Sequence, residues 1–391
     1  MSHQLTSPVA AKSVEDTSFY RSAVLLSRND VGFHPQHFSA PAEAFHQVCI
    51  ERGASFPDNL LTTATHDHKR GEDTRTRLAV LSETADWYAE QVERWLQLSA
   101  PLKTGEQQIS PGDELMLYQA ILGSWPLHME GEGALEDYAK RLTQWQEKAM
   151  REAKLQSSWS APNEAYETAS REFLQALLLS PDGLALRQSI GATANRIATA
   201  GALNSLAQTL LRMTVPGVPD LYQGTEFWDF SLVDPDNRRP VDYPARERAL
   251  SQSTSLTELL AQWQDGRIKQ ALIAQVLMLR NQHSSLFSEG RYQPLEVVGE
   301  KAAHVVAFAR ETQGVRAIVV VPRLPAELMG TAQTPFINAA NWGDTRILLP
   351  FTDSHPDWKG LFSQATVTSS KEMLLSAALK EISVNLLIQT L

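Results

Sequence analysis

The stretch TTATHDHKRGEDTRTRLAVLS, residues Thr62–Ser82, contains the change of pattern on which the predicted fold depends. It begins with residues that favour a β-strand, namely Thr62, Thr63 and Thr65. After Gly71 the apolar side chains recur every three or four positions, which predicts a helix with one buried face: Leu78, Leu81, Ala85, Tyr88, Val92 and Trp95. We therefore predict that His66, Asp67 and His68 lie where a strand ends and a turn leads into a helix.

The composition is that of an ordinary globular protein. The chain has 391 residues, of which 43% are hydrophobic and 20% charged, and this length suits about two or three domains. No apolar run reaches the roughly 18 residues that a membrane span needs, and the first residues lack the pattern of a signal peptide. Cys49 is alone, which excludes an internal disulfide and a cysteine-based zinc site, so we predict a small, partly buried apolar side chain. These features fit a reducing cytoplasm.

The formal net charge is −10, from 35 basic and 45 acidic residues. Such an acidic surface repels phosphate backbones, so the sequence predicts no nucleic-acid partner and no other strongly charged partner. The densest group of basic residues is interrupted by Glu72 and Asp73, and we interpret it as a helix start held by local ion pairs and hydrogen bonds. Its members are Lys69, Arg70, Arg75 and Arg77.

Residues 84–200 show an almost wholly helical pattern. Thr84 is placed to cap a helix that continues to Leu98, and Asp113–Leu122 follows as a second helix. Two more stripes of apolar residues have helical spacing: Leu135, Tyr138, Leu142, Trp145 and Ala149, then Tyr166, Ala169, Phe173 and Leu177. Helices in such a row must pack on one another, which predicts an inserted helical subdomain.

The rest of the chain changes from helix to strand. A helix from Ala200 to Met213 is predicted to end at the following VPGVP, and Val218–Pro219 suits a short strand at a barrel rim. One more helix, Ala271–His283, precedes β-branched runs separated by turn residues. These runs predict an antiparallel β-sandwich with Val319–Val321 at its centre. They are Tyr292–Val298, His304–Arg310, Val315–Pro322 and Thr345–Pro350.

Several segments are similar to one enzyme family. They are ATHDHKRGEDTRTRLAVLSE, QLTSPVAAKSVEDTSFYR, LMLYQAILGSWP, REAKLQSSWSAPNEAYE, PGVPDLYQGTE and SLVDPDNRRPVDY. These segments resemble the maltooligosyltrehalose synthases, members of the α-amylase superfamily of (β/α)8-barrel enzymes, whose catalytic groups stand at the strand ends. The resemblance covers essentially the whole chain but only the C-terminal part of such an enzyme.

The resemblance implies an α/β fold: the C-terminal part of a (β/α)8 barrel with a large helical insertion, followed by an antiparallel β-sandwich domain. Residues 1–83 would hold the barrel tail with the His-Asp segment, and 84–199 the inserted helical subdomain. Residues 200–289 would form the end of the barrel and 290–391 the C-terminal sandwich. Near the start, Pro8–Ala11 is expected to be a short extended stretch.

The resemblance also implies a sugar site. Asp67 matches the carboxylate that stabilises the transition state, and His66 matches the neighbouring histidine that binds the sugar. The other implied substrate-binding residues are Lys69, Arg70, Lys12, Glu15 and Asp16. From the residues alone, Glu15 and Asp16 equally suit the first turn of a helix, where the helix dipole favours carboxylates. Neither a metal nor a cofactor is implied.

Two sets of residues keep two interpretations. Trp87, Trp95, Trp125 and Trp145 are either core residues or stacking platforms for sugars. Glu226, Asp234, Asp236, Arg238 and Arg239 either contact sugar hydroxyls or form an arginine–carboxylate lock that holds their loop. The sequence departs from the family pattern at two positions: His68 stands where threonine is usual, and Gly71 where serine is usual.

The implied activity is that of an isomerase of trehalose biosynthesis, which rearranges the terminal α-1,4 bond at the reducing end of a malto-oligosaccharide into an α,α-1,1 bond. Retaining glycosidic chemistry needs a nucleophile and a general acid. The family carries both on the first five barrel strands, and no segment of this sequence matches them. We therefore expect the chain, either a C-terminal fragment or one half of a split enzyme, to be inactive alone; in the second case its partner would be a separate N-terminal chain with those strands.

Two other functions are compatible with the residues. A non-catalytic α-glucan-binding or scaffold protein would use the same rim and aromatic side chains. A metal-dependent hydrolase would use His66 and His68, which would share one face if they lay on a strand.

Overall fold

The computed structural model describes residues 2–129, 131–351, 357–362 and 366–390. These residues form two compact units. Unit 1 comprises residues 1–38, 66–198 and 229–240, and unit 2 comprises 39–65, 199–228 and 241–391. The long helix α8, Leu184–Thr214, contains one of the three points at which the chain passes from unit 1 to unit 2. Within the described ranges, no helix is both long and apolar enough to cross a membrane.

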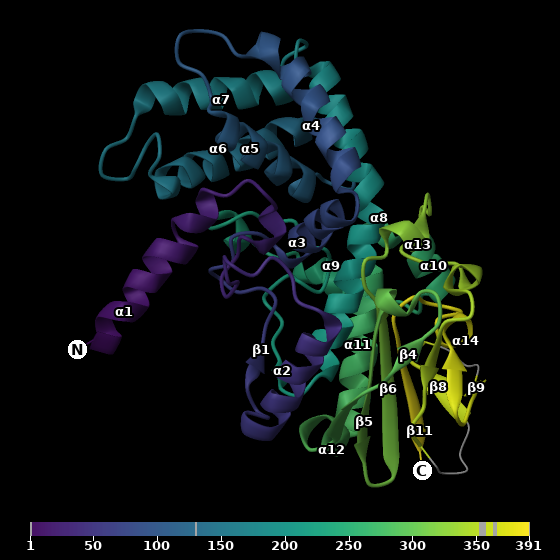
Figure 1. Cartoon of the computed structure of the whole chain (residues 1–391). Coiled ribbons are helices and arrows are strands. Elements are labelled where there is room, and N and C mark those ends of the chain that lie inside the picture. Colours follow the sequence, from purple (N-terminus) through teal and green to yellow (C-terminus); the bar gives the residue numbers. More distant parts are fainter. Residues whose placement is uncertain (1, 130, 352–356, 363–365, 391) are drawn as a thin grey trace. The chain divides into compact units, whose positions relative to one another are not determined.

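The regular elements of unit 1 are all helices within the described residues, apart from an isolated bridge between Arg70 and Leu232 (Figure 1). Its main helices are α1 (Ser2–Ala10), α3 (Glu72–Ala79), α4 (Ala85–Ser99), α5 (Pro111–Ser124), α6 (Ala134–Ala153), α7 (Glu164–Leu179) and the first part of α8. Caps explain two of the starts, because Ser110 accepts a hydrogen bond from the N–H of Asp113, and Asn163 accepts one from Tyr166. The predicted helices between residues 84 and 200 are thus confirmed.

Two local predictions for unit 1 are wrong. The helix expected to run unbroken from Asp73 is interrupted, since a 3-10 turn at Val80–Glu83 separates α3 from α4. The extended stretch expected at Pro8–Ala11 is helical, with α1 continuing into a π-helix at Ala11–Glu15. Pro8 is the seventh of the nine residues of α1 and lies inside the helix, where its ring removes one backbone N–H donor.

The core of unit 1 settles part of the question about the tryptophans. Trp95 is fully buried, packs edge-to-face on Tyr118 at 5.4 Å between ring centroids, and donates a hydrogen bond to Ser189. Trp145 is also buried. The core interpretation is confirmed for these two. Trp87 and Trp125 are partly exposed, and Trp87 carries the guanidinium of Arg196 over its ring.

Unit 2 contains a single pair of parallel strands among the described residues. β1 (Leu60–Leu61) pairs with β2 (Val218–Pro219), so the predicted short strand at Val218 is confirmed. The strand predicted at Thr62–Thr65 is wrong, because β1 ends at Leu61. Thr62 Oγ1 instead donates to the carbonyl of Ala64 at 2.6 Å, a local bond that competes with strand pairing. With one parallel pair, the barrel itself stays a prediction.

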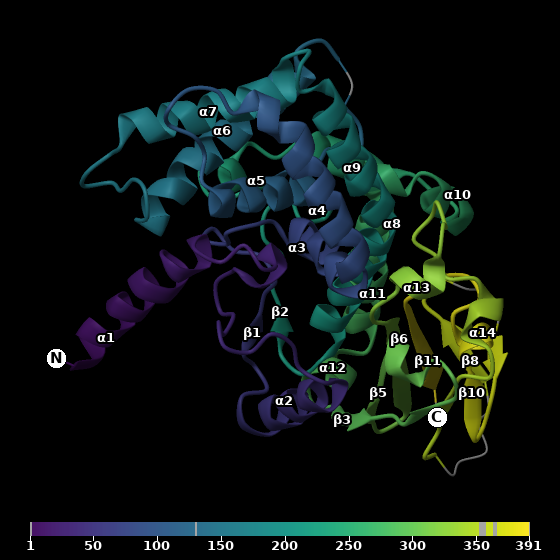
Figure 2. The same cartoon turned by 45° about the horizontal axis from the view of Figure 1, so that its top comes forward.

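The helices of unit 2 precede two antiparallel sheets (Figures 1 and 2). The helices are α2 (Ala42–Ser55), the second part of α8, α9 (Tyr243–Ser251), α10 (Leu256–Ala261), α11 (Arg267–Gln282) and α12 (Ser284–Ser288). Two further short helices, α13 (Ala326–Met329) and α14 (Leu375–Ala378), lie between strands. Cys49 of α2 is 1% exposed, as predicted for a buried apolar side chain.

The larger sheet has the order β3-β5-β6-β11-β8-β9, and the smaller one the order β10-β7-β4. β6 (Val315–Pro322) is buried at every position, as expected of a central strand covered on both faces, so the central place of Val319–Val321 is confirmed. The other strands are β3 (Arg291–Pro294), β4 (Val297–Val298), β5 (Val305–Thr312), β7 (Arg346–Leu348), β8 (Asp357–Gly360), β9 (Thr366–Thr368), β10 (Glu372–Leu374) and β11 (Asn385–Thr390). The predicted antiparallel character is confirmed, and the last four strands were missed. The domain boundaries proposed after residues 83, 199 and 289 stay a prediction.

Candidate functional site

His66 and Asp67 form an exposed turn on a buried base within unit 1. Both residues are exposed, whereas the three that follow them are at most 2% exposed. The backbone of the turn is fixed by the loop 229–240, because the carbonyl of His66 accepts hydrogen bonds from Asn237 Nδ2 at 3.0 Å and from Arg238 Nη2 at 3.5 Å. The arrangement holds the turn from one side and leaves the Asp67 carboxylate exposed.

Asp30 holds the same segment from below and was missed by sequence reasoning. Its carboxylate accepts the N–H of Lys69 at 2.9 Å and that of Arg70 at 3.0 Å, and it lies 3.5 Å from Arg75 Nε. Asp30 is 1% exposed, so these bonds satisfy a charge that burial would otherwise make costly. Nothing in the local sequence distinguishes it from an ordinary loop aspartate.

Lys69 and Lys12 meet on the carboxylate of Asp16. Asp16 accepts from Lys69 Nζ and from Lys12 Nζ, each at 2.5 Å, and the Lys69 side chain is 3% exposed while that of Lys12 is 75% exposed. Burial works to raise the pKa of Asp16, but hydrogen bonds from the two lysines outweigh it, so this pKa lies below its ordinary value. Three of the predicted substrate-binding residues are thus brought together.

Glu15 lies beside this group and accepts the N–H of Gly32 at 3.1 Å. The alternative reading of Glu15 and Asp16 as a helix N-terminal turn is wrong, since Glu15 ends the π-helix and Asp16 follows it. The helix dipole disfavours a carboxylate there. Lys12 and Lys69 supply the compensating charge for Asp16.

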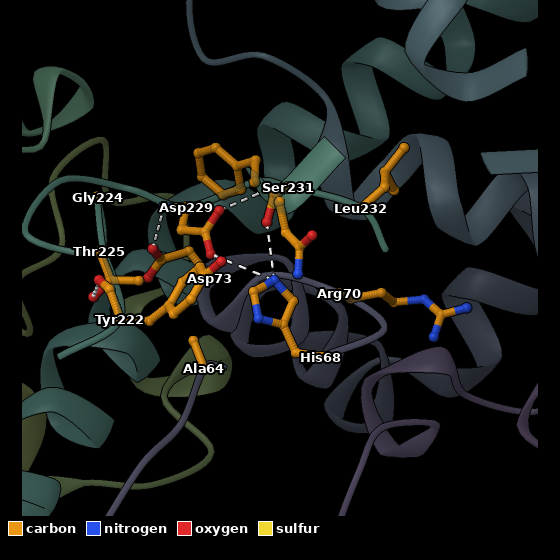
Figure 3. A network of polar contacts seen from close by, with 12 residues as sticks. Ala64, His68, Arg70, Asp73, Tyr222, Gly224, Thr225, Asp229, Ser231 and Leu232 are labelled. Atoms are coloured by element: carbon orange, nitrogen blue, oxygen red, sulfur yellow. Dashed lines mark hydrogen bonds and ion pairs between the residues drawn. The ribbon is translucent and has the colours of Figure 1, made fainter. Parts of the chain in front are cut away.

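Arg70 stands apart from the other predicted substrate-binding residues. Its side chain is fully buried, and its Nη1 donates to the carbonyl of Asn29 at 2.9 Å. Figure 3 shows its guanidinium pointing away from His68, while its backbone forms a bridge with Leu232. Arg70 therefore belongs to the base of the site and has no exposed surface for a sugar.

The loop 229–240 is held by an arginine–carboxylate lock. Arg141 of α6 binds Asp236 with two hydrogen bonds of 2.8 and 2.9 Å, and Arg239 adds an ion pair at 3.0 Å. Lys148, seven positions further along α6, forms an ion pair with Asp234. The lock interpretation is confirmed for Asp236, with Arg141 as the main partner. The spacing of residues 141 and 148, which lie on one face of a helix, was the signal that sequence reasoning overlooked.

Glu226 belongs to unit 2 and takes no part in this lock. Its carboxylate lies 3.1 Å from Arg246 Nε. Gly224 nearby has a φ of +87°, which favours glycine, and a Cβ there would lie 3.1 Å from Val241 Cγ2.

Replacing Arg141 by methionine should destabilise unit 1 because it leaves the buried Asp236 carboxylate without its main partner. We expect a loss of about 3 kcal/mol in the free energy of unfolding, measured by urea denaturation at pH 7. Lys140→Met on the same helix is the matched control, because Lys140 and its partner Asp137 are both largely exposed, and it should change nothing measurable. Equal stability of the Arg141→Met variant and the wild type would contradict the lock.

The same pair predicts the pH dependence of this loss. Burial works to raise the pKa of Asp236, but the hydrogen bond and charge of Arg141 outweigh it and hold this pKa below its ordinary value. A carboxyl with a lowered pKa in the folded state contributes stability above its unfolded pKa and loses it as the pH falls through the folded value. The difference between wild type and Arg141→Met should therefore be full at neutral pH and shrink below about pH 4.

The two histidines of the turn do not form the pair that a metal site would need. They lie in a turn and not on a strand, and His66 is exposed while His68 is buried. In the described part of the chain, no group of three or more His, Cys, Asp or Glu side chains is placed to hold a metal ion.

Comparison with known proteins gives consistent relatives, although no family model matches the chain. Over 351 residues, 89% of its length, the chain is 38% identical to putative maltooligosyl trehalose synthases of Mycobacterium tuberculosis strains CDC 1551 and H37Rv, of which it covers 40%. The solved maltooligosyltrehalose synthase of Arthrobacter ramosus matches 99% of the chain with a TM-score of 0.78 and 31% identity, over 46% of its own length. Another solved maltooligosyl trehalose synthase gives a TM-score of 0.76 at 26% identity, over 97% of the chain and 46% of its own.

These likenesses first define the class, which is that of the amylase-type enzymes. More particularly, the chain is homologous to the maltooligosyltrehalose synthases and corresponds to their C-terminal part. The resemblance seen in the sequence is thereby confirmed. The chain spans less than half the length of these relatives.

Proposed function

We propose that the chain supplies the transition-state-stabilising part of a maltooligosyltrehalose synthase. The observation that carries the proposal is the exposed His66–Asp67 turn on its buried base, in a chain 38% identical to such enzymes over 351 residues. A carboxylate held rigidly at the surface of a site suits the support of a developing positive charge.

In the proposed reaction the terminal α-1,4 bond at the reducing end of a malto-oligosaccharide breaks. The remaining oligosaccharide is held as a glycosyl ester on a nucleophilic carboxylate. A general acid protonates the departing glucose. The anomeric hydroxyl of that glucose then attacks the anomeric carbon of the glycosyl ester and gives its proton to the deprotonated general acid, which forms the α,α-1,1 bond and frees the carboxylate. Water must stay out, because it would hydrolyse the same ester.

Within this scheme Asp67 would accept hydrogen bonds from the 2- and 3-hydroxyls of the distorted sugar, and His66 would help to position it. Lys69 and Lys12 hold Asp16 at the side of the turn. Because the turn that carries Asp67 is held in place, its carboxylate needs little reorganisation when positive charge develops on the sugar.

The buried and partly buried carboxylates around the turn are engaged in structural bonds. Asp16 accepts from two lysines, Asp30 accepts three backbone N–H groups, and Asp236 accepts from Arg141. Each of these carboxylates already accepts hydrogen bonds from the groups that it holds. A carboxylate bound in this way suits neither a free nucleophile nor a general acid. We therefore propose that both groups come from outside these 391 residues, on a preceding segment or on a separate chain.

Unit 2 offers a surface for such a partner. α2 has one buried residue, Cys49, and large apolar side chains are exposed on it and just after it: Val48, Ile50, Phe56 and Leu60, which are 41–71% exposed. Large apolar side chains with this degree of exposure are candidates for an interaction surface. We propose that the N-terminal part of the enzyme covers them.

The test is to express the 391-residue chain together with the N-terminal half of a homologous synthase and to incubate the purified assembly with maltopentaose. We expect reducing ends to disappear without release of glucose, and the α,α-1,1 linkage to be visible by NMR. If the assembly forms and binds maltopentaose by calorimetry but leaves it unchanged, the alternative function, a non-catalytic glucan-binding protein, would replace the proposed one.

A further inference from the structure

Gly71 lies directly against the start of the loop 229–240. Its N–H donates to the carbonyl of Ser231 at 2.8 Å. A Cβ at this position would lie 2.3 Å from the carbonyl oxygen of Asp229 and 2.8 Å from its Cγ, which is closer than real side chains come. Because the φ of Gly71 is −51°, an ordinary value, its role is to leave this space empty.

His68 fills the adjoining position with a polar contact. Its side chain is 3% exposed, and Nε2 lies 3.1 Å from Ser231 Oγ and 3.9 Å from Asp229 Oδ2. Figure 3 shows the imidazole pointing at both of these side chains. The loop is also closed on itself, because Asp229 accepts the N–H of Ser231 at 3.0 Å. On the other side, Asp73 of α3 accepts the N–H of Asp229 at 2.5 Å.

We infer that His68 and Gly71 form a latch that holds the loop 229–240 against the segment presenting His66 and Asp67. Gly71 leaves room for the loop to lie close, and the side chain of His68 contacts the loop there. The far end of the same loop reaches back to the turn itself, where Asn237 Nδ2 binds the carbonyl of His66 at 3.0 Å. His68 is thus a positioning residue, which acts on Asp67 through the loop.

The internal bonds of the loop connect its two ends. The N–H of Leu232 donates to Asp236 at 2.8 Å, and the backbones of Arg70 and Leu232 form a bridge. Asp236 is in turn fixed by Arg141. A movement of Asp229 and Ser231 away from His68 would therefore be passed to Asn237 and to the turn.

The test is amide hydrogen exchange, followed by mass spectrometry, on the full chain and its variants His68→Ala, His68→Gln, Gly71→Ala and the double variant His68→Ala/Gly71→Ala. In peptides covering residues 228–238 and 64–72, exchange should quicken about tenfold in His68→Ala and Gly71→Ala, the factor expected when roughly one hydrogen bond of local stability is lost. Gly112→Ala, where a Cβ meets nothing within 4 Å, and His128→Ala, at an exposed position, are the matched controls. Unchanged exchange of α6 and α7 verifies that each variant is folded.

Two further comparisons separate a latch from mere packing. A glutamine at 68 keeps an N–H donor for Ser231 and should recover at least half of the lost protection. In the double variant the effects should not add, because Gly71→Ala already displaces the partner of His68. Equal exchange in the glutamine and alanine variants, or full additivity, would overturn the latch, as would unchanged exchange in both single variants.

The effect of His68 on sugar binding rests on the proposed function and is measured separately. The affinity for maltopentaose, measured by calorimetry on the reconstituted assembly, should fall several-fold in His68→Ala while the control variants keep it. If the assembly binds no sugar but the exchange pattern is as expected, the latch stands and the proposed function fails. If sugar binds equally well to wild type and His68→Ala despite faster exchange, the positioning role of His68 is overturned.

Discussion

Asparagine in place of Asp67 should lower the turnover of the complete enzyme by about 10²- to 10³-fold. The substitution keeps the shape of the side chain but removes the negative charge that, in the proposed mechanism, supports the developing oxocarbenium ion. Because Asp67 is exposed and its turn is fixed through the His66 carbonyl, the exchange should leave folding unaffected. The loss should therefore appear in kcat for maltopentaose, with a small change in KM.

Two variants frame this measurement. His66→Ala should weaken the positioning of the sugar and cost less than Asp67→Asn. Asp182→Asn, at an exposed aspartate in the loop before α8, should have no effect. If Asp67→Asn kept more than about a third of the wild-type turnover, the role assigned to Asp67 would be wrong.

Patterns that depend on local periodicity were predictable from the sequence. The apolar stripe at Tyr138, Leu142 and Trp145 became α6, and the β-branched run at Val319 became the central strand β6. In both cases burial follows from spacing alone. The position of the His66–Asp67 turn was also predictable, since Gly71 and the acidic residues after it mark a helix start.

Features that depend on a partner far along the chain were not predictable. The threonines after Leu61 have strand propensity, but the pairing of β1 with β2 ends at Leu61. The Thr62 hydroxyl instead donates a hydrogen bond to the nearby backbone. Asp30 and Arg141 act through hydrogen bonds to Arg70 and Asp236, which lie about 40 and 95 positions further along the chain. Their importance became visible once folding had brought those residues together.

The two departures from the family pattern also depend on residues far along the chain and could not be interpreted from the sequence. His68 and Gly71 look independent in the sequence, since each replaces a small hydroxylated residue. In the structure both contact the same two residues, Asp229 and Ser231. A pair of changes that share one contact is expected to be coupled, and a single sequence carries no record of that coupling.

The 391-residue chain on its own should leave maltopentaose reducing, however long the incubation. Asp67 can stabilise a positive charge, but one carboxylate cannot also protonate the leaving group and attack the anomeric carbon in the same turnover. The other carboxylates of the site are committed to structural bonds, as Asp16 is to Lys69 and Asp236 to Arg141. Without a covalent intermediate there is nothing for the freed glucose to attack.

The measurement follows reducing ends over time for the isolated chain, for a complementary chain carrying the N-terminal half, and for the two together. Conversion should occur in the mixture alone, and Asp67→Asn should reduce it there. Phe56→Asp should weaken the assembly, because Phe56 is 69% exposed and is one of the apolar side chains that we propose the N-terminal half covers. Conversion by the isolated, homogeneous chain would mean that two of its own carboxylates leave their structural partners to do the chemistry, and the assignment of Asp16, Asp30 and Asp236 as framework would be wrong.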